Sequence, residues 1–173
     1  MKRYVSRVLT PMGAGAICFT DDVLLRFDPH ADPLKGTFAQ GLEDAIYGEG
    51  HPLALWVQRE LDAYFGGALR EFTMPVDPQV SPFFKKVLAA LQQVPFGTTV
   101  SYEELALLAG SPRACRAVGT AMRNNPIPIV IPCHRVVRKD GGVGGFSMTG
   151  GVPVKERLLT FERAALEKGS GKY

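Results

Sequence analysis

Apolar and polar residues alternate in short runs near the N-terminus, which predicts a small sheet. Residues 4–8 alternate roughly with period two, and residues 16–19 are apolar. An Asp-Asp turn then separates this run from a third apolar run at residues 23–27. These runs predict an antiparallel meander. A helix is expected near residues 38–47, where the pattern is less regular.

A better-defined helix is predicted to begin at Pro52, because proline suits the first helical turn. Two glycines at positions 66 and 67 are expected to end it. Between them, apolar residues recur at helical spacing, namely Leu53, Trp56, Val57, Leu61 and Tyr64.

The second half of the chain predicts four further helices, at about residues 83–92, 101–108, 112–123 and 154–166. The second of these starts with a Ser and a Glu three positions apart, the pattern of a capping box. A tight Gly-Ser turn joins the second helix to the third, and two short helices joined in this way are typical of a helix-turn-helix.

A proline-rich stretch at residues 74–78 suggests a boundary between two domains, 1–78 and 79–173. The predicted fold class is α+β. It comprises a small N-terminal antiparallel sheet with helices, followed by a mainly helical, winged-helix-like domain that contains the helix-turn-helix.

The two predicted domains differ in charge. Residues 1–78 hold 7 basic and 11 acidic side chains, whereas residues 79–173 hold 13 and 6. No acidic residue lies between Glu104 and Asp140, a segment that carries six Lys and Arg residues. This distribution is expected of a polyanion binder, although a solvated basic surface would also produce it.

The overall composition excludes several classes of protein. With 46% hydrophobic and 21% charged residues, the 173-residue chain is not globally disordered. No apolar run is long enough to span a membrane, and we expect neither a signal peptide nor a membrane partner. The three cysteines lack CxxC spacing, so we expect no disulfide framework, no metal site and a cytoplasmic location.

The helix predicted at 112–123 has unusually small side chains, which would let its backbone approach a ligand closely. Three arginines on this segment could contact phosphates or bases: Arg113, Arg116 and Arg123. Tight packing against another helix is the alternative. We favour a DNA-facing helix.

Cys133 and His134 follow a run with three prolines in seven positions. A cysteine beside a histidine, with Arg135 next to them, can have a lowered thiol pKa and act as a nucleophile. In an extended strand the two side chains would point to opposite faces, so cooperation requires a bend or a bridging water. A buried structural cysteine beside an incidental histidine is the alternative.

Residues 132–136, with the sequence PCHRV, resemble the active-site signature of the O6-alkylguanine-DNA alkyltransferases (methylated-DNA–protein-cysteine S-methyltransferases). Four more blocks are similar to this family, in order and at suitable intervals: residues 100–102, 116–119, 125–128 and 155–162. The resemblance covers about residues 80–165.

The resemblance implies DNA repair by irreversible transfer of an alkyl group from guanine O6 to Cys133, once per molecule and without a cofactor. His134 would act as a base through water and be oriented by Glu162. Tyr102 would donate to the leaving guanine and crowd the phosphate beside the flipped nucleotide.

The resemblance also implies a partner, double-stranded DNA bearing O6-alkylguanine, which a monomer binds through the minor groove. Arg116 would replace the flipped base in the stack. The other DNA-binding residues would be Arg113, Ala117, Gly119, Arg123 and Tyr102. The base pocket and hinge would use Asn125, Met122, Val136, Ser147, Phe146 and Lys155.

The glycine-rich loop at residues 141–151 lacks the Gly-Lys-Ser/Thr ending of a phosphate-binding loop, which argues against that function. The family resemblance implies instead that this loop closes the base pocket. It departs from the family pattern in two extra residues, Met148 and Thr149, and in Phe146, where many members have tyrosine. The range of alkyl groups accepted therefore stays open.

Two other functions would account for parts of the sequence. A non-enzymatic lesion binder or helix-turn-helix regulator would keep the DNA-facing helix but lose the cysteine, which is present here. A Cys-His hydrolase would leave Arg116 and its helix without a role, and no glycine-rich nucleophile elbow is found.

Overall fold

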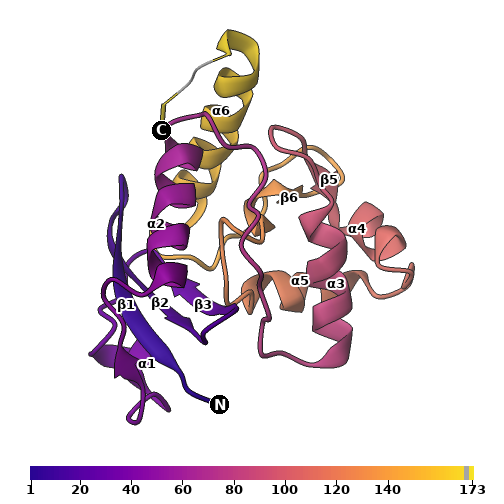
Figure 1. Cartoon of the computed structure of the whole chain (residues 1–173). Helices are drawn as coiled ribbons and strands as arrows, with labels where there is room; N and C mark the ends of the chain where they lie inside the picture. The colour runs from indigo at the N-terminus through magenta and orange to yellow at the C-terminus, as the bar shows by residue number, and fades with distance from the viewer. Residues whose placement is uncertain (170–171) are drawn as a thin grey trace. The chain divides into compact units, whose positions relative to one another are not determined.

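The computed structural model describes residues 1–169 and 172–173, which divide into two compact units, Met1–Gln79 and Val80–Tyr173. The first unit holds a four-stranded sheet in the order β3-β2-β1-β4 (Figure 1). Its strands are β1 (Tyr4–Thr10), β2 (Gly13–Phe19), β3 (Leu24–Asp28) and β4 (Ile46–Tyr47).

The sheet is mixed, because β4 runs parallel to β1 while β1, β2 and β3 form the antiparallel meander. The helix expected near residues 38–47 is wrong. Only α1 (Gly36–Ala39) is helical, and Gly41 then adopts a left-handed φ of 75°. The backbone N–H of Ile46 donates to the carbonyl of Arg3, which draws this segment into the sheet.

Helix α2 (Pro52–Phe65) packs on β1 and β2 and supplies much of the core of the first unit. The side chain of His51 caps it by accepting from the backbone N–H of Leu53. As the periodicity predicts, Val57, Leu61 and Tyr64 are fully buried.

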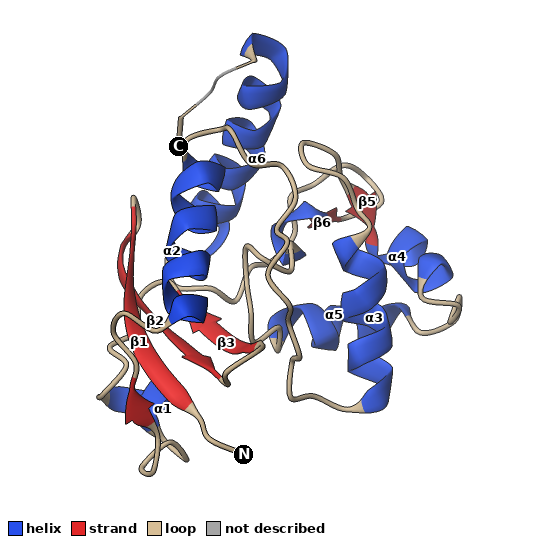
Figure 2. Cartoon of the chain, in the orientation of Figure 1, coloured by secondary structure: helices blue, strands red, loops and turns tan. Residues whose placement is uncertain are grey.

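The second unit is mainly helical, and Figure 2 shows its three short helices grouped together. These are α3 (Pro82–Gln92), α4 (Tyr102–Leu108) and α5 (Cys115–Arg123), which all contact one another. A 3-10 turn, η1 (Cys133–Arg135), and a long closing helix, α6 (Gly151–Lys168), follow. A two-stranded parallel sheet joins β5 (Val100–Ser101) to β6 (Val136–Val137).

The helix-turn-helix consists of α4 and α5, and the predicted capping box at Ser101 and Glu104 is present. Helix α5 begins at Cys115 rather than at Pro112, because Ser111 and Ala114 are joined in a separate turn that precedes it. The α+β fold class is confirmed. None of the described helices combines the length and apolar character needed to cross a membrane.

Candidate active site

Cys133 is held at the start of a tight turn rather than in an extended strand. Its backbone N–H donates to the carbonyl of Ile131, and the N–H of Arg135 donates to that of Pro132, both at 2.9 Å. The chain therefore bends where the cysteine and the histidine are adjacent. This bend removes the objection that neighbouring side chains of a strand face opposite ways.

The Cys133 side chain is buried, and burial raises the pKa of its thiol. A hydrogen bond from the Asn125 side chain and the charge of Lys155 act in the opposite direction but are outweighed. The expectation of a lowered thiol pKa is therefore wrong, because desolvation of the thiolate dominates. Forming the thiolate requires a group that takes the proton.

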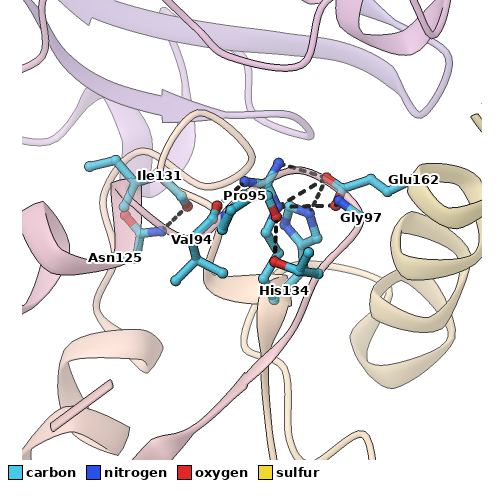
Figure 3. A network of polar contacts seen from close by, with 9 residues as sticks. Val94, Pro95, Gly97, Asn125, Ile131, His134 and Glu162 are labelled. Atoms are coloured by element: carbon cyan, nitrogen blue, oxygen red, sulfur yellow. Dashed lines mark hydrogen bonds and ion pairs between the residues drawn. The ribbon is translucent and has the colours of Figure 1, made fainter. Parts of the chain in front are cut away.

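A buried carboxylate, that of Glu162, links α6 to η1 and to the loop at Gly97 (Figure 3). Glu162, on α6, lies 2.8 Å from Nε2 of His134 and accepts from the backbone N–H of Gly97 at 3.0 Å. The Nε and Nη2 atoms of Arg135 also donate to it, at 3.0 Å each. The side chains of His134 and Glu162 are fully buried.

The charge states in this network follow from burial and pairing. Burial acts to raise the pKa of Glu162, but His134 and Arg135 outweigh it and hold that pKa well below its usual range. Burial lowers the pKa of His134 against the pull of Glu162. At neutral pH the carboxylate is thus ionised and the imidazole is uncharged.

The ionised carboxylate also fixes the tautomer of His134. A carboxylate only accepts, so Nε2 carries the hydrogen and Nδ1 carries a lone pair. In the described part of the chain, Nδ1 of His134 is the one buried side-chain nitrogen or oxygen without a hydrogen-bond partner. It is therefore available to accept a proton.

A cavity of about 790 Å³ opens beside Cys133. Eight predicted site residues line it: Tyr102, Arg116, Gly119, Met122, Arg123, Cys133, Phe146 and Ser147. Cys115, Thr120 and Gly145 complete the wall. The structure thus brings most of the predicted residues to one hollow of the second unit.

Helix α5 presents two different faces. Val118, Ala121 and Met122 are buried, while Arg116 and Arg123 are exposed. Gly119 has no atom within 4 Å of where a Cβ would lie, so close helix packing does not explain this glycine. The small residue keeps the surface of α5 low beside the cavity.

The glycine-rich loop closes over the cavity and is fastened at two points. The Ser147 hydroxyl donates to the carbonyl of Arg123 at 3.0 Å, at the end of α5. The Lys155 ammonium donates to the carbonyls of Val136 and Gly145, at 2.6 and 3.2 Å. Burial lowers the pKa of Lys155 to about 8.

Five predicted residues lie behind the cavity wall rather than on it: His134, Glu162, Asn125, Val136 and Lys155. The Asn125 amide donates to the carbonyl of Ile131 at 2.8 Å and accepts from the N–H of Ile127, so it joins the end of α5 to the cysteine segment. Arg113, which is exposed, and Ala117 are not brought to the cavity either.

Sequence reasoning missed two residues of interest. Arg135 was considered only as a charge near the thiol, although its buried position on Glu162 makes it part of the network. Cys115, the first residue of α5, is half-buried and lines the same cavity as Cys133. Among the described residues, no cluster of His, Cys, Asp and Glu could hold a metal ion.

The fold and the site define a helix-turn-helix protein with a buried cysteine on a cavity that the second helix of the pair, α5, also lines. The family model described as "6-O-methylguanine DNA methyltransferase, DNA binding domain" matches residues 82–164. A crystal structure of the Mycobacterium tuberculosis OGT in complex with DNA has a TM-score of 0.81 and 32% identity, covering 94% of both chains. The chain belongs to the O6-methylguanine-DNA methyltransferase family.

Curated relatives carry a consistent name. The methylated-DNA–protein-cysteine methyltransferase of Methanosarcina barkeri is 46% identical over 104 residues, 60% of this chain and 65% of that protein. The human protein of the same name is 47% identical over 131 residues, 72% of this chain and 62% of that protein. The chain thus spans somewhat less than two thirds of the length of these relatives.

Proposed function

We propose that this protein repairs DNA by transferring the alkyl group of O6-alkylguanine to Cys133, once per molecule. The observation that carries the proposal is the position of this cysteine. It faces a cavity walled by the arginine-bearing side of α5, with a hydrogen-bonded base behind it. Family membership and the shared name of the relatives support the same activity.

The proposed reaction is a displacement at a saturated carbon. His134 takes the thiol proton at Nδ1, through a bridging water in the relay that the family resemblance implies, and the sulfur attacks the alkyl carbon. A carbon–sulfur bond forms as the bond to guanine O6 breaks, and its electron pair passes to the guanine, which takes up a proton. Tyr102 lines the cavity as a hydroxyl donor, with a pKa raised by burial and by Cys133.

The product is a thioether, which does not hydrolyse readily. No group that would remove the alkyl group from sulfur has been identified in the cavity wall. We therefore propose a single turnover with no cofactor.

The proposed partner is duplex DNA with the damaged base flipped out of the stack. Arg116 and Arg123 are exposed on α5 beside the cavity, and Gly119 keeps that face shallow, which suits approach to the minor groove. Arg113 and Ala117 would contact the sugar-phosphate backbone of the DNA. We propose that residues 79–173 bind DNA and carry out the transfer as a monomer. The three free thiols fit a reducing compartment such as the cytoplasm.

The test is incubation with a duplex carrying O6-methylguanine, followed by intact-protein and peptide mass spectrometry. We expect one methyl group per molecule, located on Cys133 and absent from Cys133→Ala. Cys115→Ala is the matched control, because it removes the other thiol of the same cavity and should still be methylated. Methylation of Cys115 instead would refute the assignment.

The competing function is a lesion binder without chemistry. In that case the wild-type protein would bind the damaged duplex and remain unmodified. The buried relay of His134 and Glu162 favours the enzyme, since a binder has no use for a proton acceptor beside a thiol.

A further inference from the structure

Arg135 is buried on the 3-10 turn that carries the cysteine, and each of its three guanidinium nitrogens donates a hydrogen bond. Two of its nitrogens donate to Glu162, and Nη1 donates to the carbonyl of Val94 at 2.7 Å. The guanidinium carbon also lies 5.7 Å from the centre of the Phe96 ring. Arg135 is not part of the cavity wall, so a role in catalysis would have to act through Glu162.

Within the part of the chain that the structure describes, Arg135 and His134 are partners of Glu162 that could carry positive charge. A buried carboxylate whose sole partner is a histidine favours the imidazolium form, because the anion stabilises the cation. Arg135 already supplies one full positive charge to this carboxylate. If His134 were protonated on both ring nitrogens, its positive charge would be buried with no negative charge left to balance it.

The other ionisable groups near His134 either disfavour protonation of its imidazole, as Arg135 does, or leave it unaffected. Lys155, on α6, adds a further positive charge that disfavours the imidazolium. Cys133 is held as the neutral thiol by burial. Among the described residues, the carboxylate of Glu162 is thus the group that favours charging the imidazole, and Arg135 is paired with it.

We propose that Arg135 is a positioning residue that neutralises Glu162 and so keeps His134 uncharged, with hydrogen on Nε2 and a free lone pair on Nδ1. This inference rests on the proposed function, in which His134 takes the proton of Cys133. Without Arg135, the carboxylate would convert the base into an imidazolium that cannot accept that proton.

The direct test is ¹⁵N NMR of the histidine rings in the full-length protein, with the His134 signals assigned by their loss in His134→Gln. In the wild type we expect a neutral ring with Nε2 protonated across the neutral pH range. In Arg135→Met the midpoint of His134 titration should rise by at least one pH unit. Arg138→Gln is the matched control, since Arg138 pairs with Asp140 on the surface and its loss should leave His134 unchanged.

The functional readout is the single-turnover rate of methyl transfer to Cys133 as a function of pH. The acid limb for Arg135→Met should move upward with the His134 midpoint. A one-unit rise gives a rate loss of about tenfold at pH values below both midpoints, and the loss disappears as pH rises above them. Arg135→Lys keeps the charge but loses the two-pronged hydrogen bond. It should be slower at all pH values with an unmoved acid limb.

Equal rate losses in both variants, with no movement of the His134 titration, would overturn the proposal and leave Arg135 a structural residue. If Arg135→Met does not fold, Arg135→Lys still decides the matter. If the His134 midpoint rises by a full unit in Arg135→Lys, a positive charge beside Glu162 is not what controls the protonation of His134. A wild-type protein that transfers no methyl group would instead refute the proposed function.

Discussion

Replacing Arg116 by alanine should slow transfer from duplex DNA far more than transfer from free O6-benzylguanine. Arg116 is exposed on the first turn of α5 and lines the cavity that holds Cys133. Its side chain makes no hydrogen bond or ion pair within the part of the chain that the structure describes. Its loss should therefore change the free energy of unfolding by at most about 0.5 kcal/mol.

The size of the effect follows from base flipping. Extruding a base costs a few kcal/mol of lost stacking and pairing, part of which an inserted side chain offsets. If Arg116 offsets about 2 kcal/mol, its removal slows duplex repair about 30-fold at neutral pH. Free O6-benzylguanine needs no flipping, so its reaction with Cys133 should change less than about twofold.

The assay is single-turnover alkylation of Cys133 with each substrate, across a range of salt concentrations. Arg123→Ala and Arg113→Ala are controls that remove the same charge from exposed positions on or beside α5. Loss of a phosphate contact should reduce the salt dependence of binding by about one counterion. The reasoning is refuted if Arg116→Ala slows both substrates equally, or if Arg113→Ala slows transfer from saturating duplex as much as Arg116→Ala does.

Three further predictions concern the network and the loop. Glu162→Gln should lower the free energy of unfolding by about 3–5 kcal/mol, because it leaves the buried guanidinium of Arg135 without its carboxylate. Urea denaturation measures this loss, and an unchanged urea midpoint would contradict the buried ion pair. Burial lowers the pKa of His134, so the unfolded chain takes up a proton there that the folded chain does not. The free energy of unfolding should then fall by up to about 1.4 kcal/mol per pH unit as pH drops from about 6.5 toward the lower folded-state pKa, and His134→Gln should remove this slope. Gly144→Ala should lower the free energy of unfolding by about 1–2 kcal/mol, because Gly144 has a φ of 75°. Gly145→Ala should be nearly neutral, since nothing lies within 4 Å of its Cβ position. Equal losses of stability in thermal denaturation would count against a strained loop.

Local sequence patterns predicted the elements whose free energy is decided within a few residues. The capping box at Ser101, and the proline and apolar spacing of α2, each act over one or a few helical turns. The family blocks identified Cys133, His134 and Glu162 because their order along the chain is itself the signal.

Predictions that required a distant partner were less successful. The strand β4 forms by pairing with β1, about forty residues earlier, which no pattern within residues 38–47 reveals. The start of α5 at Cys115 is a local difference, set by the turn in which the N–H of Ala114 donates to the carbonyl of Ser111.

The sequence by itself determined which atoms could react, since a thiol, an imidazole and a carboxylate are properties of residue types at given positions. Only the tertiary structure decided their charges. Burial reversed the expected direction of the Cys133 pKa, and the return of α6 brought Glu162 within 2.8 Å of His134 from 28 positions away. Ionisation depends on solvent exclusion and on neighbouring charges, and both are set by parts of the chain that meet only after folding.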